Sequence, residues 1–108
     1  MDFTVWSEND RLYHKLSVEI DHHAVTRTRR EVDMLISKKR PKMLIMDLSE
    51  IDFMDSSGLG FVLGRLRKMK DIGGGVLVLD PEPRARDMLM LAGADKLIKI
   101  AYSDGAGA

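Results

Sequence analysis

The sequence predicts a single α/β domain over residues 1–108, with a mixed, mainly parallel sheet of four to five strands. Some segments repeat apolar residues every three to four positions, as helices do, while others alternate or are continuously apolar, as strands do. The two kinds of segment alternate along the chain, and glycine or proline separates several of them. The expected order is β-β-α-β-α-β-α-β, with the helices packed on the sheet.

The first two strands are expected to form an antiparallel hairpin. Residues 3–6 are a short strand candidate, and a polar turn around residues 8–10 follows. Over residues 12–20 apolar and polar side chains alternate, which is typical of a strand with one buried face. His14 lies on the apolar face of this strand, so a histidine in the core or at its rim is expected.

A helix is expected over about residues 22–39. Asp21 is placed to act as its N-cap, and Pro41 prevents the helix from continuing because proline lacks the amide hydrogen. The apolar stripe of this helix consists of Val25, Thr28, Val32, Leu35 and Ile36.

The second half of the chain repeats the strand-and-helix pattern. Residues 43–46 form a continuous apolar run, which favours a strand buried on both faces. The next helix should begin near Ser57 and end at Gly73–Gly74. A strand over residues 76–79 follows. The inner stripe of the helix is expected to be Leu59, Val62, Leu63, Leu66 and Met69.

The C-terminal part should contain a short helix over residues 84–92, closed by Gly93, and a last strand over residues 97–100. Residues 104–108 are glycine, alanine and aspartate, and we expect them to form a loose tail.

Composition excludes several functional classes. Seventeen basic and 17 acidic residues cancel, so a general nucleic-acid binder is not expected. The chain has no cysteine, and no apolar run approaches the roughly 18 residues of a membrane span. The N-terminus does not resemble a signal peptide, so we expect a cytoplasmic protein without membrane contacts. Although the net charge is zero, residues 27–42 are mainly basic and residues 47–55 are acidic.

The segment from Asp52 to Gly60 contains the candidate functional residues, because it follows a buried strand and begins a helix. Ser56 or Ser57 is a candidate N-cap. Ser57 as a hydrolase nucleophile is disfavoured, because the G-x-S-x-G motif is missing. Alternatively, Ser57 accepts a phosphoryl group from a partner kinase, since a helix N-terminus stabilises an anion.

Three glycines, Gly58, Gly60 and Gly64, lie in or near the first turns of this helix, where each costs roughly 1 kcal/mol relative to alanine. One explanation is close packing of the helix on the sheet. The other is a bare surface over which another protein approaches the serine.

Four segments carry a resemblance to a known family: Ile45–Met46–Asp47–Leu48, Phe53–Met54–Asp55–Ser56–Ser57–Gly58–Leu59–Gly60, Leu63–Gly64–Arg65 and Glu19–Ile20–Asp21–His22–His23. Together they resemble the STAS-domain anti-anti-sigma factors. The resemblance covers about residues 11–100. It also implies a further C-terminal helix, and the composition of residues 104–108 leaves open whether such a helix forms.

The resemblance implies that the unphosphorylated protein binds an anti-sigma factor that is also an ATP-dependent serine kinase, which releases a sporulation sigma factor. The kinase would phosphorylate Ser57 rather than Ser56, and the phosphoprotein would no longer hold the kinase. A metal-dependent serine phosphatase would reset the switch. The protein itself is expected to be no enzyme and to need no cofactor or metal. The expected partner-binding residues are Asp21, His22, Asp55, Ser56, Ser57, Gly58, Leu59, Gly60, Leu63 and Gly64.

Several residues keep more than one interpretation. Asp21 is either a cap alone or also part of the partner-binding face. Asp55 caps the helix, orients Ser57 or contacts the kinase. His22 and His23 do not favour a metal site, because neighbouring residues on a helix point in different directions. The basic residues Arg65, Arg67, Lys68 and Lys70 are expected to form a solvated helix face.

The alternative function is a nucleotide-binding or small enzymatic α/β domain that uses the helix start at Ser57 for phosphate. The chain lacks both the G-x-x-x-x-G-K-[ST] motif and a G-x-G-x-x-G motif after its first strand, which disfavours this alternative.

Overall fold

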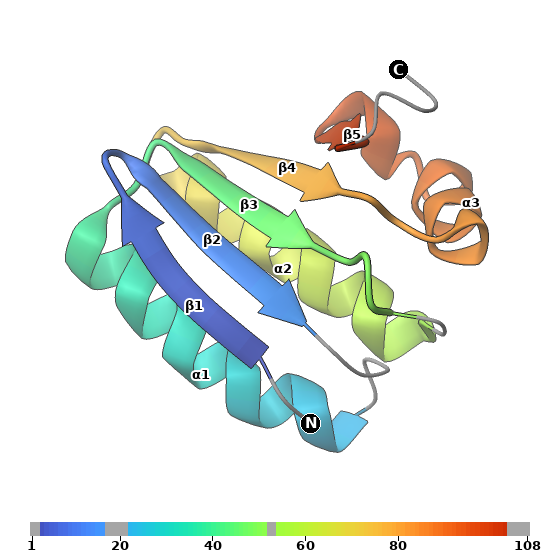
Figure 1. Cartoon of the computed structure of the whole chain (residues 1–108), viewed down its shortest axis with the longest axis horizontal. Helices are drawn as coiled ribbons and strands as arrows, with labels where there is room; N and C mark the ends of the chain where they lie inside the picture. The colour runs from blue at the N-terminus through green and yellow to red at the C-terminus, as the bar shows by residue number, and fades with distance from the viewer. Residues whose placement is uncertain (1–2, 17–21, 52–53, 104–108) are drawn as a thin grey trace.

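Within the part of the chain that the structure describes, five strands form one sheet, and their spatial order follows their order in the chain (Figure 1). The computed structural model describes residues 3–16, 22–51 and 54–103. The first strand runs antiparallel to the second, and all other neighbours are parallel, so the predicted mixed sheet is confirmed. The strands are β1 (Phe3–Glu8), β2 (Arg11–Leu16), β3 (Met43–Asp47), β4 (Gly75–Leu79) and β5 (Lys99–Ala101).

Among the described residues, three α-helices connect the parallel strands, in the predicted order. Figure 1 shows α1 and α2 on the same face of the sheet. Helix α3 lies near β5, at the edge of the sheet opposite β1. A short 3-10 helix, η1, precedes β5 and was not predicted. The helices are α1 (His22–Lys39), α2 (Ser56–Asp71), α3 (Pro83–Leu91) and η1 (Ala94–Lys96).

Most of the core lies between the sheet and helices α1 and α2, and Ala85 and Leu89 of α3 belong to the same cluster. In β2 the alternation continues through Leu12, His14 and Leu16, which are all buried, while residues 17–20 lie outside the described part. β3 is buried on both faces, as predicted. The predicted stripe of α1 is confirmed at Thr28, Val32 and Ile36; Leu35 is half-buried, and the side chain of Val25 is outside the description.

Two sequence-based predictions need correction. In α2, Val62, Leu66 and Met69 are buried as expected, but Leu59 and Leu63 are only half-buried, because the buried face turns toward Phe61 and Arg65. The last strand begins at Lys99 instead of residue 97. Gly93 adopts a left-handed conformation with φ 76°, which leads directly into η1 and keeps residues 97 and 98 in the turn.

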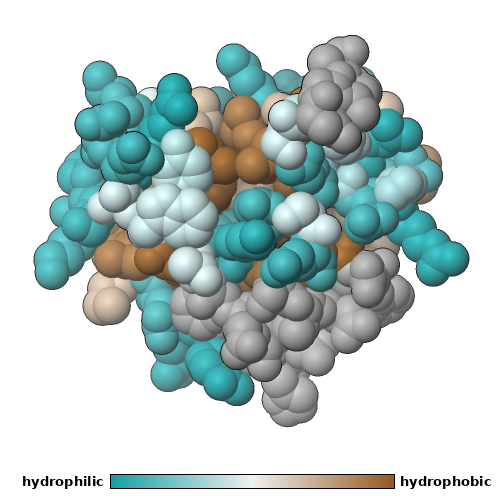
Figure 2. All heavy atoms as spheres, in the orientation of Figure 1, coloured by the Kyte–Doolittle hydropathy of each residue, from teal (hydrophilic) through white to brown (hydrophobic). Residues whose placement is uncertain are grey.

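The other face of the sheet is turned toward the viewer in Figure 1. There the rings of Trp6 and Tyr13 stack with centroids 5.0 Å apart. In the same orientation, Figure 2 shows hydrophobic atoms exposed between hydrophilic side chains. Within the described residues, none of the helices combines the length and apolar character that crossing a membrane requires.

The end of α2 is fixed by two glycines, as predicted. Gly73 adopts φ 79°, and the amide of Gly74 donates to the carbonyl of Met69 at 2.7 Å. A Cβ atom at Gly74 would lie 2.9 Å from the backbone oxygen of Lys42, which cannot move away as a side chain can.

We therefore expect Gly74→Ala to lower the free energy of unfolding by about 1–3 kcal/mol. Urea unfolding measures this change. Gly64→Ala is the matched control, because a Cβ at Gly64 would have no atom within 4 Å. Equal stability of the two variants would contradict the close approach at Gly74.

His14 is fully buried, and its Nε2 lies 2.9 Å from Thr28 Oγ1 of α1. Burial lowers its pKa from 6.5 to about 4, and the positive charge of Arg65 contributes to the decrease. Because the folded-state pKa is the lower one, the unfolded chain binds more protons between these values. Stability is therefore complete above pH 6.5 and falls as the pH decreases toward 4.

Lowering the pH from 7.5 to 5.5 should reduce the free energy of unfolding by about 1 kcal/mol through His14 alone. Urea unfolding of wild type and His14→Gln at both pH values isolates this contribution, since glutamine does not titrate. The same pH dependence in both proteins would show that His14 is not responsible.

Candidate functional site

The candidate site lies where the chain passes from β3 into α2. Asp55 has extended backbone angles (φ −96°, ψ −170°), and its Oδ1 accepts a hydrogen bond from the amide of Gly58 at 3.0 Å. Its own carbonyl accepts from the amide of Leu59. Asp55 is therefore the N-cap. The interpretation of Ser56 or Ser57 as the cap is wrong: they are the first two residues of the helix.

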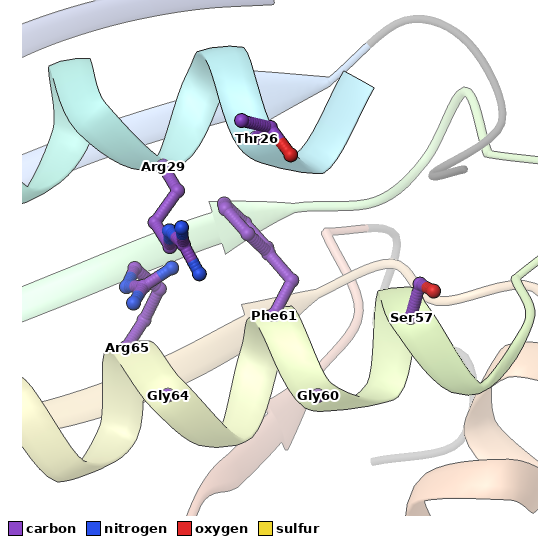
Figure 3. Close-up of a pocket in the computed structure, with 7 residues that line it drawn as sticks. All are labelled: Thr26, Arg29, Ser57, Gly60, Phe61, Gly64 and Arg65. Carbon is purple, nitrogen blue, oxygen red and sulfur yellow. The ribbon is translucent and has the colours of Figure 1, made fainter. Parts of the chain in front are cut away.

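The two serines differ in their surroundings. Ser56 is exposed, whereas Ser57 is half-buried and faces a groove of about 390 Å³ between α1 and α2 (Figure 3). The residues that line the groove are Thr26, Arg29, Ser57, Gly60, Phe61, Gly64 and Arg65.

Gly60 and Gly64 form an unobstructed side of this groove. A Cβ atom built on either residue would have no other atom within 4 Å. Close packing of the helix on the sheet therefore does not explain these two glycines, and the alternative of a bare surface next to the serine fits them. Gly58 differs, because it is buried and its amide bonds to the cap.

The remaining predicted partner-binding residues do not all lie at the groove. Leu59 and Leu63 are half-buried and pack against the hydrophobic core. His22 is the first residue of α1, and its side chain lies outside the description. Asp21 lies outside the described residues altogether. The structure thus brings Ser57, Gly60 and Gly64 together and separates Leu59 and Leu63 from them.

Arg65 corrects the expectation of a solvated basic face. Only 6% of the residue is exposed. Its Nε lies 2.8 Å from Asp33 Oδ1 of α1, which makes an ion pair. These two atoms do not form a hydrogen bond. The guanidinium also lies over the ring of Phe61, 5.0 Å from its centroid. Burial lowers the pKa of Arg65, and nearby Arg29 lowers it further, while Asp33 opposes both.

The sequence contained a signal for part of this arrangement. Phe61 and Arg65 follow Ser57 at intervals of four, so all three share one face of a helix. Thr26 and Arg29 could not be identified in this way. They belong to the groove because α1 packs beside α2, and a periodicity within one helix does not reveal its neighbour.

The groove lining offers two hydroxyls, those of Thr26 and Ser57, and two cations, those of Arg29 and Arg65. In the part of the chain that the structure describes, no three His, Cys, Asp or Glu side chains gather as a metal site would require. His14 is buried in the core, as predicted, and lies within hydrogen-bond distance of Thr28.

The chain is similar to known proteins in sequence and in fold. The STAS domain model matches residues 7–105. An anti-sigma F factor antagonist of Paenibacillus polymyxa is 35% identical over 80% of this chain and 74% of its own length. An antagonist of the same name from Lysinibacillus sphaericus is 37% identical over 73% of this chain and 68% of its own length.

Solved structures are similar as well. The anti-sigma factor antagonist SpoIIAA in its unphosphorylated form has a TM-score of 0.77 at 28% identity, covering 92% of this chain and 86% of that one. The phosphorylated form of SpoIIAA from Bacillus has a TM-score of 0.78 at 29% identity, covering 97% and 96%. The matched domain, the related sequences and the fold lead to one conclusion: the chain belongs to the STAS-domain family of anti-sigma factor antagonists.

Proposed function

We propose that the unphosphorylated chain binds an anti-sigma factor that is also an ATP-dependent serine kinase and so releases a sporulation sigma factor. The observation that carries the proposal is the position of Ser57, two residues after the cap Asp55 and at one end of an open groove. The names of the related antagonists support the class of partner. The chain acts in the cytoplasm as a binding protein and not as an enzyme.

Phosphorylation of Ser57 switches the interaction off by a local change. A phosphoserine adds about −1.5 to −2 charges, and the positive end of the α2 dipole tolerates an anion at this position. The fold is therefore retained, while the new charge lies near the carboxylate of Asp55. A partner surface that fits a neutral hydroxyl is repelled, and a metal-dependent serine phosphatase restores the hydroxyl.

Two matches support a local effect. This chain resembles the unphosphorylated and phosphorylated forms of SpoIIAA almost equally, with TM-scores of 0.77 and 0.78. The surface around Ser57 also supports access by a kinase, because Gly60 and Gly64 leave the adjacent side of the helix open.

Incubation with the kinase and ATP should add one phosphoryl group to the wild-type chain and to Ser56→Ala, but none to Ser57→Ala. Intact-protein mass spectrometry measures the transfer, and circular dichroism confirms that each variant is folded. A phosphoryl group that persists in Ser57→Ala would place the modified residue elsewhere.

Substitution of Gly60 should separate stability from binding. Gly60→Ala should raise the free energy of unfolding by about 0.5–1 kcal/mol, because alanine favours a helix and its Cβ has open space. Gly60→Gln should weaken binding of the anti-sigma factor, because its longer side chain covers the approach to Ser57. Urea unfolding and calorimetric titration measure the two effects.

Arg67→Ala serves as the control for Gly60→Gln, since Arg67 is an exposed residue of the same helix that does not line the groove. If Gly60→Gln and Arg67→Ala bind the partner as tightly as the wild type, the open glycine surface has no role in recognition.

A further inference from the structure

Two arginines point toward one another across the groove beside Ser57 (Figure 3). Arg29 extends from α1 and is exposed, whereas Arg65 extends from α2 and is more than nine-tenths buried. Two like charges are thereby held together. Such an arrangement is stable only where negative charge or solvent compensates it.

The compensation within the described part of the molecule is incomplete. Asp33 is the one carboxylate there that forms an ion pair with Arg65, so the three side chains together carry one excess positive charge. The Nη1 atom of Arg65 is buried and has no hydrogen-bond partner among the described residues. A buried donor without an acceptor costs free energy, which one further anionic oxygen would recover.

We propose that this groove receives one carboxylate side chain of the anti-sigma factor, held by Arg29 and Arg65 while the partner covers Ser57. The inference rests on the proposed function and identifies a specificity element within it. A protein that contacts Ser57 also covers the groove, because Ser57 and both arginines line the same depression.

The charge and shape favour a carboxylate of a partner protein over a phosphate. One carboxylate balances the single excess charge, whereas a phosphate dianion exceeds it. The free amides of the α2 N-terminus, which phosphates use, lie at the Ser57 end of the groove, and the ring of Phe61 separates that end from the arginine pair (Figure 3). Gly60 and Gly64 leave room for a side chain to enter from solvent.

Charge reversal at Arg29 tests the proposal, because this residue is exposed and is not a member of the Asp33–Arg65 ion pair. Arg27→Glu is the matched control. It makes the same charge change on the same helix, but Arg27 lies two residues away, nearly opposite on the helix, and does not line the groove.

Calorimetric titration of the full chain with the anti-sigma factor kinase should show at least about tenfold weaker binding for Arg29→Glu, and a change below about threefold for Arg27→Glu. A second titration uses inorganic phosphate alone, for which the wild-type chain should show no binding at the groove in the millimolar range.

The outcomes are distinguishable. No binding of the wild-type chain would overturn the proposed function and this inference with it. Wild-type binding with equal affinities for Arg29→Glu and Arg27→Glu would overturn the inference alone. The inference would also be overturned if the wild-type chain binds phosphate and Arg29→Glu loses that binding but keeps its affinity for the kinase. The groove would then be a phosphate site.

Discussion

The guanidinium of Arg65 lies out of water between two helices, and its neighbours are arranged around that charge. Asp33 of α1 pairs with it at 2.8 Å, and the ring of Phe61 covers it. Phe61 in turn contacts His14 of β2, with centroids 5.8 Å apart, and His14 lies 2.9 Å from Thr28 of α1. These contacts join α1, α2 and β2 in a closed circuit of polar and aromatic side chains.

These contacts connect the charged and polar groups of the core with the residues that line the groove on the surface. A buried ion pair adds little net stability, but loss of one partner is costly, so it favours one relative position of α1 and α2 over alternatives. The nearby cation also opposes protonation of His14, which must remain neutral inside the core. The walls of the groove are therefore positioned by side chains beneath them, and Ser57 lies in a helix instead of a loop.

The sequence predicted most of the fold because its local patterns are strong. The bounds of α1 were predicted correctly, and the continuous apolar run identified β3 as buried on both faces. The groove was only partly predictable. Gly60 and Gly64 were identified from their positions in one helix, and Ser57 from the helix start together with the family resemblance. Arg29 and Arg65 acquire their roles from packing between helices. A basic residue is ordinarily solvated, and only the tertiary neighbours of Arg65 make its burial tolerable.

The agreement between spatial and sequential strand order has a consequence for how the chain folds during synthesis. From β2 onward each new strand joins the edge formed by its predecessor, so no later strand must be inserted between two earlier ones. All groove-lining residues lie between Thr26 and Arg65. Both walls of the groove are therefore synthesised before α3 and β5. No residue of those later elements lines the groove.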